Sequence, residues 1–248
     1  MWASPPCETY TRLDVTNASR GNEHRDHSGL EKEPRSIESC HSEADFKKRK
    51  KAIDHDRMLC GLIAGFIKDN RLSHYYSFAV ENPQGMLAER PFMQTDKWCR
   101  LVHRQMVHYC NYGGRFWKPT HIWTSLRGWL AGGKSGTGQC CQECQVGRWK
   151  LVDKANRKTG IQYVHDNHIG GSSEKMSKTS KGEKNQKCQR WEVPHDLLTE
   201  IMAQARKEGS GSKKYVIDLF AGQGSMRPVV EEAGFIYVPV DLDVSLVK

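Results

Sequence analysis

The amino-acid sequence predicts an α/β fold, a sheet of mostly parallel strands connected by helices. Near the C-terminal end, a β-branched strand from Tyr215 runs into a glycine-rich turn, a helix and a second strand, which together make one β-α-β unit. An amphipathic helix over residues 52–70 is followed by a strand over residues 75–80. The chain also begins with a short apolar strand that stops at Pro5 and Pro6, because two prolines cannot continue a ladder of backbone hydrogen bonds.

The composition limits the function classes. The 248 residues carry a formal net charge of +9 and a pI of about 9.1, a balance that suits a polyanion such as DNA as partner. Nine cysteines lack the regular spacing of a small secreted domain, and no N-terminal basic segment precedes an apolar run, so we expect a reducing intracellular compartment, cytoplasm or nucleus. No apolar stretch is long enough to span a bilayer, so we expect no membrane partner.

Cys7 is the first candidate catalytic residue, because it follows the two prolines where the first strand ends. The prolines present the thiol in a rigid extended loop, where a thiolate can attack an electrophilic carbon. A free thiol needs a positive neighbour to ionise at neutral pH, and Arg12 is the nearest candidate in sequence. The alternative interpretation is a Pro-Pro turn with an incidental cysteine.

The segment behind this cysteine, residues 16–51, is polar and charged without a period of 2 or 3.6, which predicts a long mobile loop. A linker without a function is the alternative. The apolar face of the helix over residues 52–70 should pack on the sheet. The next strand, over residues 75–80, leads into Glu81 and Asn82, so we expect a carboxylate at the carboxyl edge of the sheet beside the thiol. The alternative for Glu81 is a surface carboxylate.

Residues 101–109 look helical, and a basic and aromatic segment follows them before a strand over residues 121–124. Arg115 and Lys118 in this segment would supply positive charge to a developing anion or to a phosphate. The alternative is a plain surface hairpin.

A flexible linker of glycine, serine and lysine over residues 132–138 introduces a small basic insert. Lysines and arginines in the insert are interleaved with Trp149 and Tyr163. This composition suits phosphate contact and base stacking, although solvated loops share it.

Cysteines and histidines in the insert raise the question of a metal. Cys140 and Cys144, with His165, His168 or Cys188 downstream, would be a ligand set for structural zinc. The spacing between the two halves fits no standard zinc finger, so the sequence favours an insert without a metal.

The C-terminal segment predicts a nucleotide-like ligand. A helix opens at Pro194, and a flexible linker over residues 208–214 leads into the β-α-β unit. Gly222 and Gly224 in its turn would let the backbone approach a ligand closely. Asp241 ends the second strand about 20 residues further on, where an acid accepts hydrogen bonds from ribose hydroxyls.

Together the two ends resemble the DNA cytosine carbon-5 methyltransferases, in particular the compact phage-type members. The resemblance rests on Pro6-Cys7 for the nucleophile, on Glu81-Asn82-Pro83 for the motif that holds the cytosine, and on Asp218 to Gly224 for the cofactor. Lys118 and Thr120 stand where the family has two arginines. The resemblance implies a Rossmann-like S-adenosylmethionine-dependent methyltransferase sheet that acts on DNA. The site residues so implied are, for catalysis, Cys7, Arg12, Glu81 and Lys118; for S-adenosylmethionine, Asp218, Phe220, Ala221, Gly222, Gly224, Ser225 and Asp241; and for the substrate, Pro6, Asn82, Arg115 and Thr120.

The two motifs stand in the reverse of the usual family order, so the sequence looks circularly permuted or cut from a longer protein. We expect residues 1–131 to carry the nucleophile and Glu-Asn-Pro motifs, residues 132–190 to form the basic insert for target recognition, and residues 191–248 to bind the cofactor. The first strand is short and a third strand is missing. We therefore expect marginal folding of the chain alone, and a further segment or a second copy that completes the sheet.

The implied reaction is methyl transfer to carbon-5 of cytosine. Cys7 would add to carbon-6 and activate carbon-5, Glu81 would stabilise protonation at the ring nitrogen, and the base must be extruded from the duplex. One alternative is an amino-nitrogen methyltransferase, whose Ser-Pro-Pro loop is similar. Another is a catalytically inactive nucleic-acid-binding relic, which Glu8 favours because the family most often has glutamine there. RNA is an alternative substrate.

Overall fold

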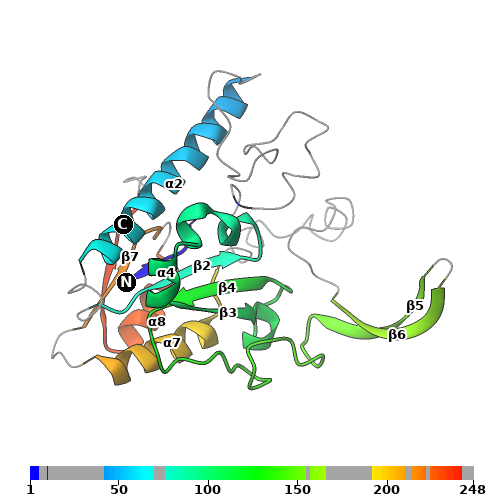
Figure 1. Cartoon of the computed structure of the whole chain (residues 1–248). Helices are drawn as coiled ribbons and strands as arrows, with labels where there is room; N and C mark the ends of the chain where they lie inside the picture. Colours follow the sequence, from blue (N-terminus) through cyan, green and yellow to red (C-terminus); the bar gives the residue numbers. More distant parts are fainter. Residues whose placement is uncertain are drawn as a thin grey trace.

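The computed structural model describes residues 1–5, 10, 42–69, 76–154, 157–165, 192–209, 214–221 and 224–241. These residues form an α/β fold with a mixed sheet between two layers of helices (Figure 1). Several candidate residues lie outside the described residues, namely Pro6, Cys7, Arg12, His168, Cys188 and Gly222.

Six strands form the main sheet: β1 (Trp2–Ala3), β2 (Ala79–Pro83), β3 (His103–His108), β4 (Pro119–Thr124), β7 (Tyr215–Asp218) and β8 (Ile236–Pro239). Their order in space is β3-β4-β2-β1-β7-β8. The pairs β2 with β1, β1 with β7, and β7 with β8 are parallel. Strand β4 is antiparallel to β2, and β3 is antiparallel to β4. Although β1 has only two residues, it pairs with β2 and β7 and so connects the two halves of the sheet.

Helices cover both faces of this sheet. The longer segments are α2 (Glu43–Lys68), α4 (Asp96–Leu101), α7 (His195–Glu208) and α8 (Arg227–Glu232), and the 3-10 segments are η4 (Met86–Glu89), η5 (Pro91–Met93) and η6 (Tyr109–Tyr112). Residues of α2 and α4 share a core with Ala3 and Val80, whereas α7 and α8 share the opposite core with Trp2 and Ala79. Successive strand residues thus point to opposite buried faces, which is why the paired residues of β1 and β2, Trp2, Ala3, Ala79 and Val80, are all apolar. Among the described residues, no helix is long and apolar enough to cross a membrane.

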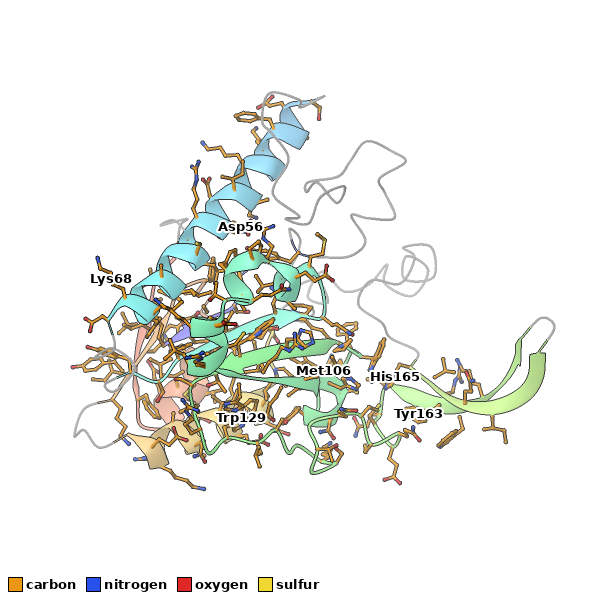
Figure 2. All side chains as sticks on the ribbon, in the orientation of Figure 1. Asp56, Lys68, Met106, Trp129, Tyr163 and His165 are labelled. Carbon is orange, nitrogen blue, oxygen red and sulfur yellow. The ribbon has the colours of Figure 1, made fainter. Side chains whose placement is uncertain are left out.

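A separate antiparallel hairpin projects from this body (Figure 1). It consists of β5 (Gly147–Lys154) and β6 (Arg157–His165) and lies within the expected basic insert. Figure 2 shows Tyr163 and His165 near the base of the hairpin, where it joins the body.

Two segments fold differently from the expectation. Residues 103–108 of the expected helix form β3, because their backbone groups pair with β4 at six successive positions. Residues 43–51 of the expected loop belong to α2. This end of the helix is largely solvent-exposed and therefore lacks the apolar stripe by which a helix is recognised, as the exposed pair of Glu43 and Lys47 illustrates.

Two boundaries also need correction. The strand expected over residues 75–80 begins at Ala79 and continues to Pro83, because its partner β4 extends the pairing to Thr120. The expected flexible linker over residues 132–138 is held in place, since the Gly132 and Gly133 N–H groups donate to the Glu200 carboxylate at 3.1 and 3.0 Å.

Candidate functional site

The carboxyl ends of β1 and β7 meet at the centre of the sheet. From β7 the chain passes through α8 to β8 on one side, and from β1 it passes through α2 to β2 on the other side. Adjacent parallel strands whose connections leave in opposite directions create a topological switch point, where open α/β sheets bind their ligands. The segment after β1 leads to Cys7, and the segment after β7 is the glycine-rich turn. The two predicted motifs therefore leave from neighbouring strands at the same edge.

Glu81 is a buried carboxylate at this edge, with 2% of its surface exposed. The Ser4 hydroxyl donates to its Oε2, and the Tyr109 hydroxyl donates to its Oε1 at 2.6 Å. The Lys118 ammonium lies 3.5 Å from Oε1 and 4.5 Å from the centre of the Tyr109 ring. A carboxylate is stable in such a place only with partners of this kind. The alternative that Glu81 is a surface carboxylate is wrong.

A second set of contacts fixes the chain on both sides of residues 6–9. Asn82 is buried, and its Nδ2 donates to the Pro5 carbonyl at 3.0 Å. Tyr10 is buried as well, and its hydroxyl donates to Asp56 of α2 at 2.8 Å. The segment that contains the predicted nucleophile is thus attached to the body at both of its ends.

The other candidates between β3 and β4 lie in different surroundings. Lys118 is buried beside Glu81, whereas Arg115 is exposed on the same connection. Thr120 is fully buried, and its hydroxyl donates to the Lys118 carbonyl at 3.2 Å. The structure therefore brings Lys118 into the site, gives Thr120 a backbone contact, and leaves Arg115 at the surface.

In the predicted cofactor motif, Asp218 is a buried acid at the end of β7. Its Oδ2 accepts a hydrogen bond from the Tyr237 hydroxyl of β8 at 2.9 Å. Burial raises the pKa of Asp218 to about 6, the nearby Asp241 carboxylate adds to the increase, and the Tyr237 hydrogen bond opposes it. The Asp218 carboxyl group therefore has a pKa well above that of an ordinary aspartate.

The turn after Asp218 has a backbone conformation that favours glycine at position 224. Gly224 adopts a φ of 71°, in the left-handed region where a side chain is strained, and its N–H donates to the Ala221 carbonyl at 2.7 Å. Ala221 is buried and Ser225 is exposed. The Phe220 ring meets His55 of α2 edge-on at 5.9 Å, so α2 borders this side of the site.

Three residues of the site were missed by the sequence analysis: Ser4, Tyr109 and Tyr237. Each acts through its hydroxyl group, and a single serine or tyrosine carries no spacing pattern. Tyr109 also lay at the end of the wrongly expected helix, so its approach to Glu81 depends on the pairing of β3 with β4. Ser4 alone had a signal, because it directly precedes the Pro5-Pro6 pair.

No protein-family model matches this chain, and no curated protein matches it in sequence. A buried carboxylate, a buried amide and a buried ammonium group lie at the carboxyl edge of the sheet, and β1 separates them from the strand that leads into a left-handed glycine turn.

Proposed function

We propose that this chain is a DNA cytosine carbon-5 methyltransferase that uses S-adenosylmethionine. The proposal depends on one observation: the buried Glu81 and Asn82 hold Ser4 and Pro5, directly before the segment that contains Cys7. Cys7 is two residues beyond Pro5, a span of at most about 7 Å for an extended chain. A thiol tethered within reach of a buried carboxylate is what carbon-5 methylation needs.

The residues after β7 and β8 fit a cofactor that carries a nucleoside. Gly224 allows a close turn, and Asp218 and Asp241 bring carboxyl groups to the carboxyl edge of the sheet. Asp241, which follows the second strand of the unit, holds the position from which an acid accepts hydrogen bonds from ribose hydroxyls. When bound, S-adenosylmethionine would supply an electrophilic methyl group.

The side chains then have complementary tasks. The Cys7 thiolate adds to carbon-6 of cytosine, and the new C–S bond makes carbon-5 nucleophilic. Glu81 accepts a hydrogen bond from the cytosine ring nitrogen as that nitrogen takes up a proton. For this contact, the cytosine must displace one of the groups that now donate to Glu81. The Ser4 hydroxyl is the donor on the segment that leads to Cys7. After methylation, a water molecule takes the proton of carbon-5, the C–S bond breaks with its electron pair returning to sulfur as the thiolate, and the ring nitrogen releases the proton that it had taken up.

The charge distribution supports DNA as the substrate. The chain carries a formal net charge of +9, and Arg148 and Lys150 are the sequence neighbours of an exposed Trp149 in strand β5 of the projecting hairpin. Basic side chains bind phosphates, and an exposed aromatic ring can stack on an unpaired base. Both contacts suit an enzyme that extrudes its target base from the duplex.

Product analysis tests the proposal. We expect the purified chain, given S-adenosylmethionine and unmethylated duplex DNA, to produce 5-methyldeoxycytidine, detected by mass spectrometry of the digested nucleosides. Cys7→Ser should abolish the product. Cys60→Ser, an exposed cysteine of α2, should leave the yield unchanged.

Other products would contradict the proposal. Methylation only at an amino nitrogen would assign the chain to the other class of methyltransferase, and methylation of RNA alone would change the substrate. No product from a folded chain that binds S-adenosylmethionine would make it an inactive relative.

A further inference from the structure

Four potential metal ligands meet where the hairpin joins the body. Cys110 lies in η6, Cys140 and Cys144 lie in the segment before β5, and His165 is the last residue of β6. Their sulfur and nitrogen atoms all lie within 4.8 Å of one another. Segments that are 55 residues apart in sequence therefore contribute to one cluster.

The spacing of these atoms fits a tetrahedron around zinc. With Zn–S bonds of about 2.3 Å and a Zn–N bond of about 2.1 Å, a tetrahedral site has S–S edges of about 3.8 Å and S–N edges of about 3.6 Å. The Cys140 and Cys144 sulfurs are 3.7 Å apart. His165 Nε2 lies 3.7 Å from the Cys110 sulfur and 3.2 Å from the Cys140 sulfur.

The surrounding groups hold the ligands in these positions. The Gln142 N–H donates to the Cys140 sulfur at 3.3 Å, and the Val146 N–H bonds to the Cys144 sulfur in the same way. Such N–H donors stabilise thiolates and orient them. The backbone bends for this contact, since Gln142 is the one non-glycine residue among the described residues with a positive φ, 60°.

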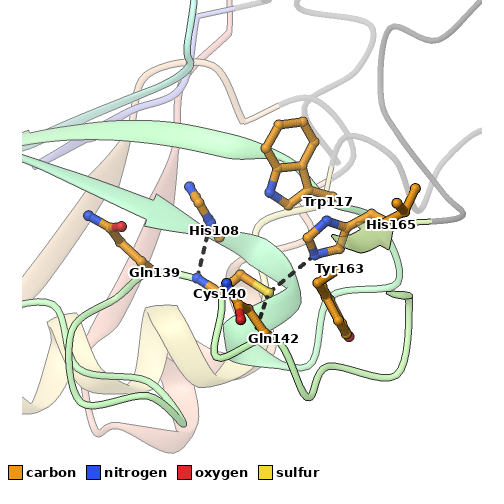
Figure 3. Close-up of a pocket in the computed structure, with 8 residues that line it drawn as sticks. His108, Trp117, Gln139, Cys140, Gln142, Tyr163 and His165 are labelled. Atoms are coloured by element: carbon orange, nitrogen blue, oxygen red, sulfur yellow. Dashed lines mark hydrogen bonds between the residues drawn. The ribbon is translucent and has the colours of Figure 1, made fainter. Parts of the chain in front are cut away.

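His165 is fixed from both sides. The Trp117 ring stacks on the imidazole at 5.3 Å, and the Tyr163 ring meets it edge-on at 5.2 Å. A cavity of about 400 Å³ adjoins Cys140 and His165, which gives an ion a path to the ligands (Figure 3). Figure 3 shows His165 and Cys140 facing each other from different segments.

We propose that Cys110, Cys140, Cys144 and His165 bind one Zn²⁺ ion as a structural site. Three thiolates and one imidazole fill all four positions of a tetrahedral ion, which is typical of structural rather than catalytic zinc. The site goes beyond the proposed methyl transfer and does not depend on it. It uses Cys110, which lies outside the insert and which the spacing of the other ligands did not indicate.

The zinc would anchor the hairpin to the body. Among the described strands, β5 and β6 pair only with each other, and an isolated two-stranded hairpin is marginally stable in water. The metal would connect both ends of the hairpin to η6, which follows directly on β3 of the main sheet. It thereby fixes the direction in which the basic hairpin projects.

Metal analysis of the full chain tests this site. We expect the reduced protein, expressed with zinc and freed of loosely bound metal by gel filtration, to contain about one zinc ion per chain. Inductively coupled plasma mass spectrometry measures this content. Cys110→Ser and Cys140→Ser should each lower this content several-fold. Cys141→Ser is the matched control, since Cys141 is next to a ligand but outside the cluster, and it should retain the metal.

Co²⁺ binding distinguishes a variant that has lost the metal site from one that has lost its fold. Co²⁺ added to the metal-free chain should give the intense visible bands of a tetrahedral thiolate complex. His165→Cys, which offers a fourth thiolate, should keep these bands with a shifted maximum, whereas His165→Ala should lose them.

Three results would overturn the proposal: a folded, reduced chain without zinc, an unchanged zinc content in both Cys110→Ser and Cys140→Ser, or a disulfide between Cys140 and Cys144 that excludes the metal. These measurements need neither DNA nor S-adenosylmethionine. A failure of the methylation assay therefore leaves them unaffected.

Discussion

Glu81 and Lys118 are opposite charges that are almost fully removed from water, 2% and 3% exposed. Glu81 is stable there because of Lys118 and the Tyr109 hydroxyl, and Lys118 is stable because of Glu81 and the Tyr109 ring. Loss of one partner from a buried pair leaves an uncompensated charge, which costs far more than loss of a surface pair. The individual residues of the site are thus coupled to the stability of the fold.

Replacement of the lysine should measure this coupling. We expect Lys118→Met to lower the free energy of unfolding by about 3–5 kcal/mol, because it leaves the Glu81 carboxylate without a cation. Glu81→Gln in the same chain should restore part of the loss in a double-mutant cycle, followed by urea unfolding. Arg115→Met, an exposed cation of the same connection, should change stability by no more than about 0.5 kcal/mol. Equal losses from Lys118→Met and Arg115→Met would contradict the buried pair.

Asp218 should make stability depend on pH. Its pKa is raised from 3.8 to about 6 in the folded chain, so between these values the folded state keeps a proton that the unfolded state has released. Stability from this residue is therefore fully present below about pH 4 and is lost as the pH rises to about 6, by up to roughly 3 kcal/mol. Asp218→Asn should remove this part of the pH dependence between pH 4 and 7, as followed by chemical denaturation at each pH. An identical pH profile in both chains would show that Asp218 ionises normally.

At the level of elements, the segment with Cys7 is held by the turn that follows β2. The Met86 N–H donates to the Tyr10 carbonyl at 2.7 Å, and the backbone of the preceding residue, Gly85, packs closely against the same carbonyl group. A Cβ at Gly85 would lie 2.3 Å from the Tyr10 carbonyl oxygen. This glycine is needed for a close approach of two backbones rather than for its own conformation, which is extended.

Gly85→Ala should therefore displace the segment with Cys7. We expect the methylation rate to fall at least tenfold while S-adenosylmethionine still binds, because the glycine-rich turn belongs to another strand. Gly61→Ala is the matched control, since a Cβ on that exposed face of α2 meets nothing within 4 Å and should slightly stabilise the helix. Full activity of Gly85→Ala would mean that the position of Tyr10 is irrelevant to the reaction.

The hairpin formed by β5 and β6 is the element that we expect to contact phosphates. The slope of log affinity against log salt concentration is negative. Arg148→Gln combined with Lys150→Gln should reduce its magnitude by roughly 1.8, which is about 0.9 for each lost phosphate contact. The exposed Lys47 and Lys51 of α2 allow a control with the same change of charge, Lys47→Gln combined with Lys51→Gln. Fluorescence anisotropy with duplex DNA at several salt concentrations gives both slopes. Equal slopes for the two double variants would indicate an effect of net charge alone.

At the level of the whole molecule, the sequence predicted what depends on local pattern. The β-α-β unit at the C-terminal end is confirmed, because β-branched strands, a turn glycine and an apolar helix face are all local signals. The strand β3 was missed, since a polar edge strand such as His103–His108 takes its conformation from its partner. The hydroxyl partners of Glu81, Ser4 and Tyr109, and the proposed metal ligand Cys110 were missed for the same reason, because tertiary pairing brings them together.

Covalent capture of Cys7 is the most direct test of the proposed chemistry. In duplex DNA with 5-fluorocytosine at the target, the fluorine cannot leave as the carbon-5 proton does, so the adduct between Cys7 and carbon-6 accumulates. We predict a complex of chain and DNA that survives denaturing electrophoresis, requires S-adenosylmethionine, is absent in Cys7→Ser and persists in Cys60→Ser. No complex from a chain that binds both DNA and S-adenosylmethionine, or an equal complex from Cys7→Ser, would contradict the account.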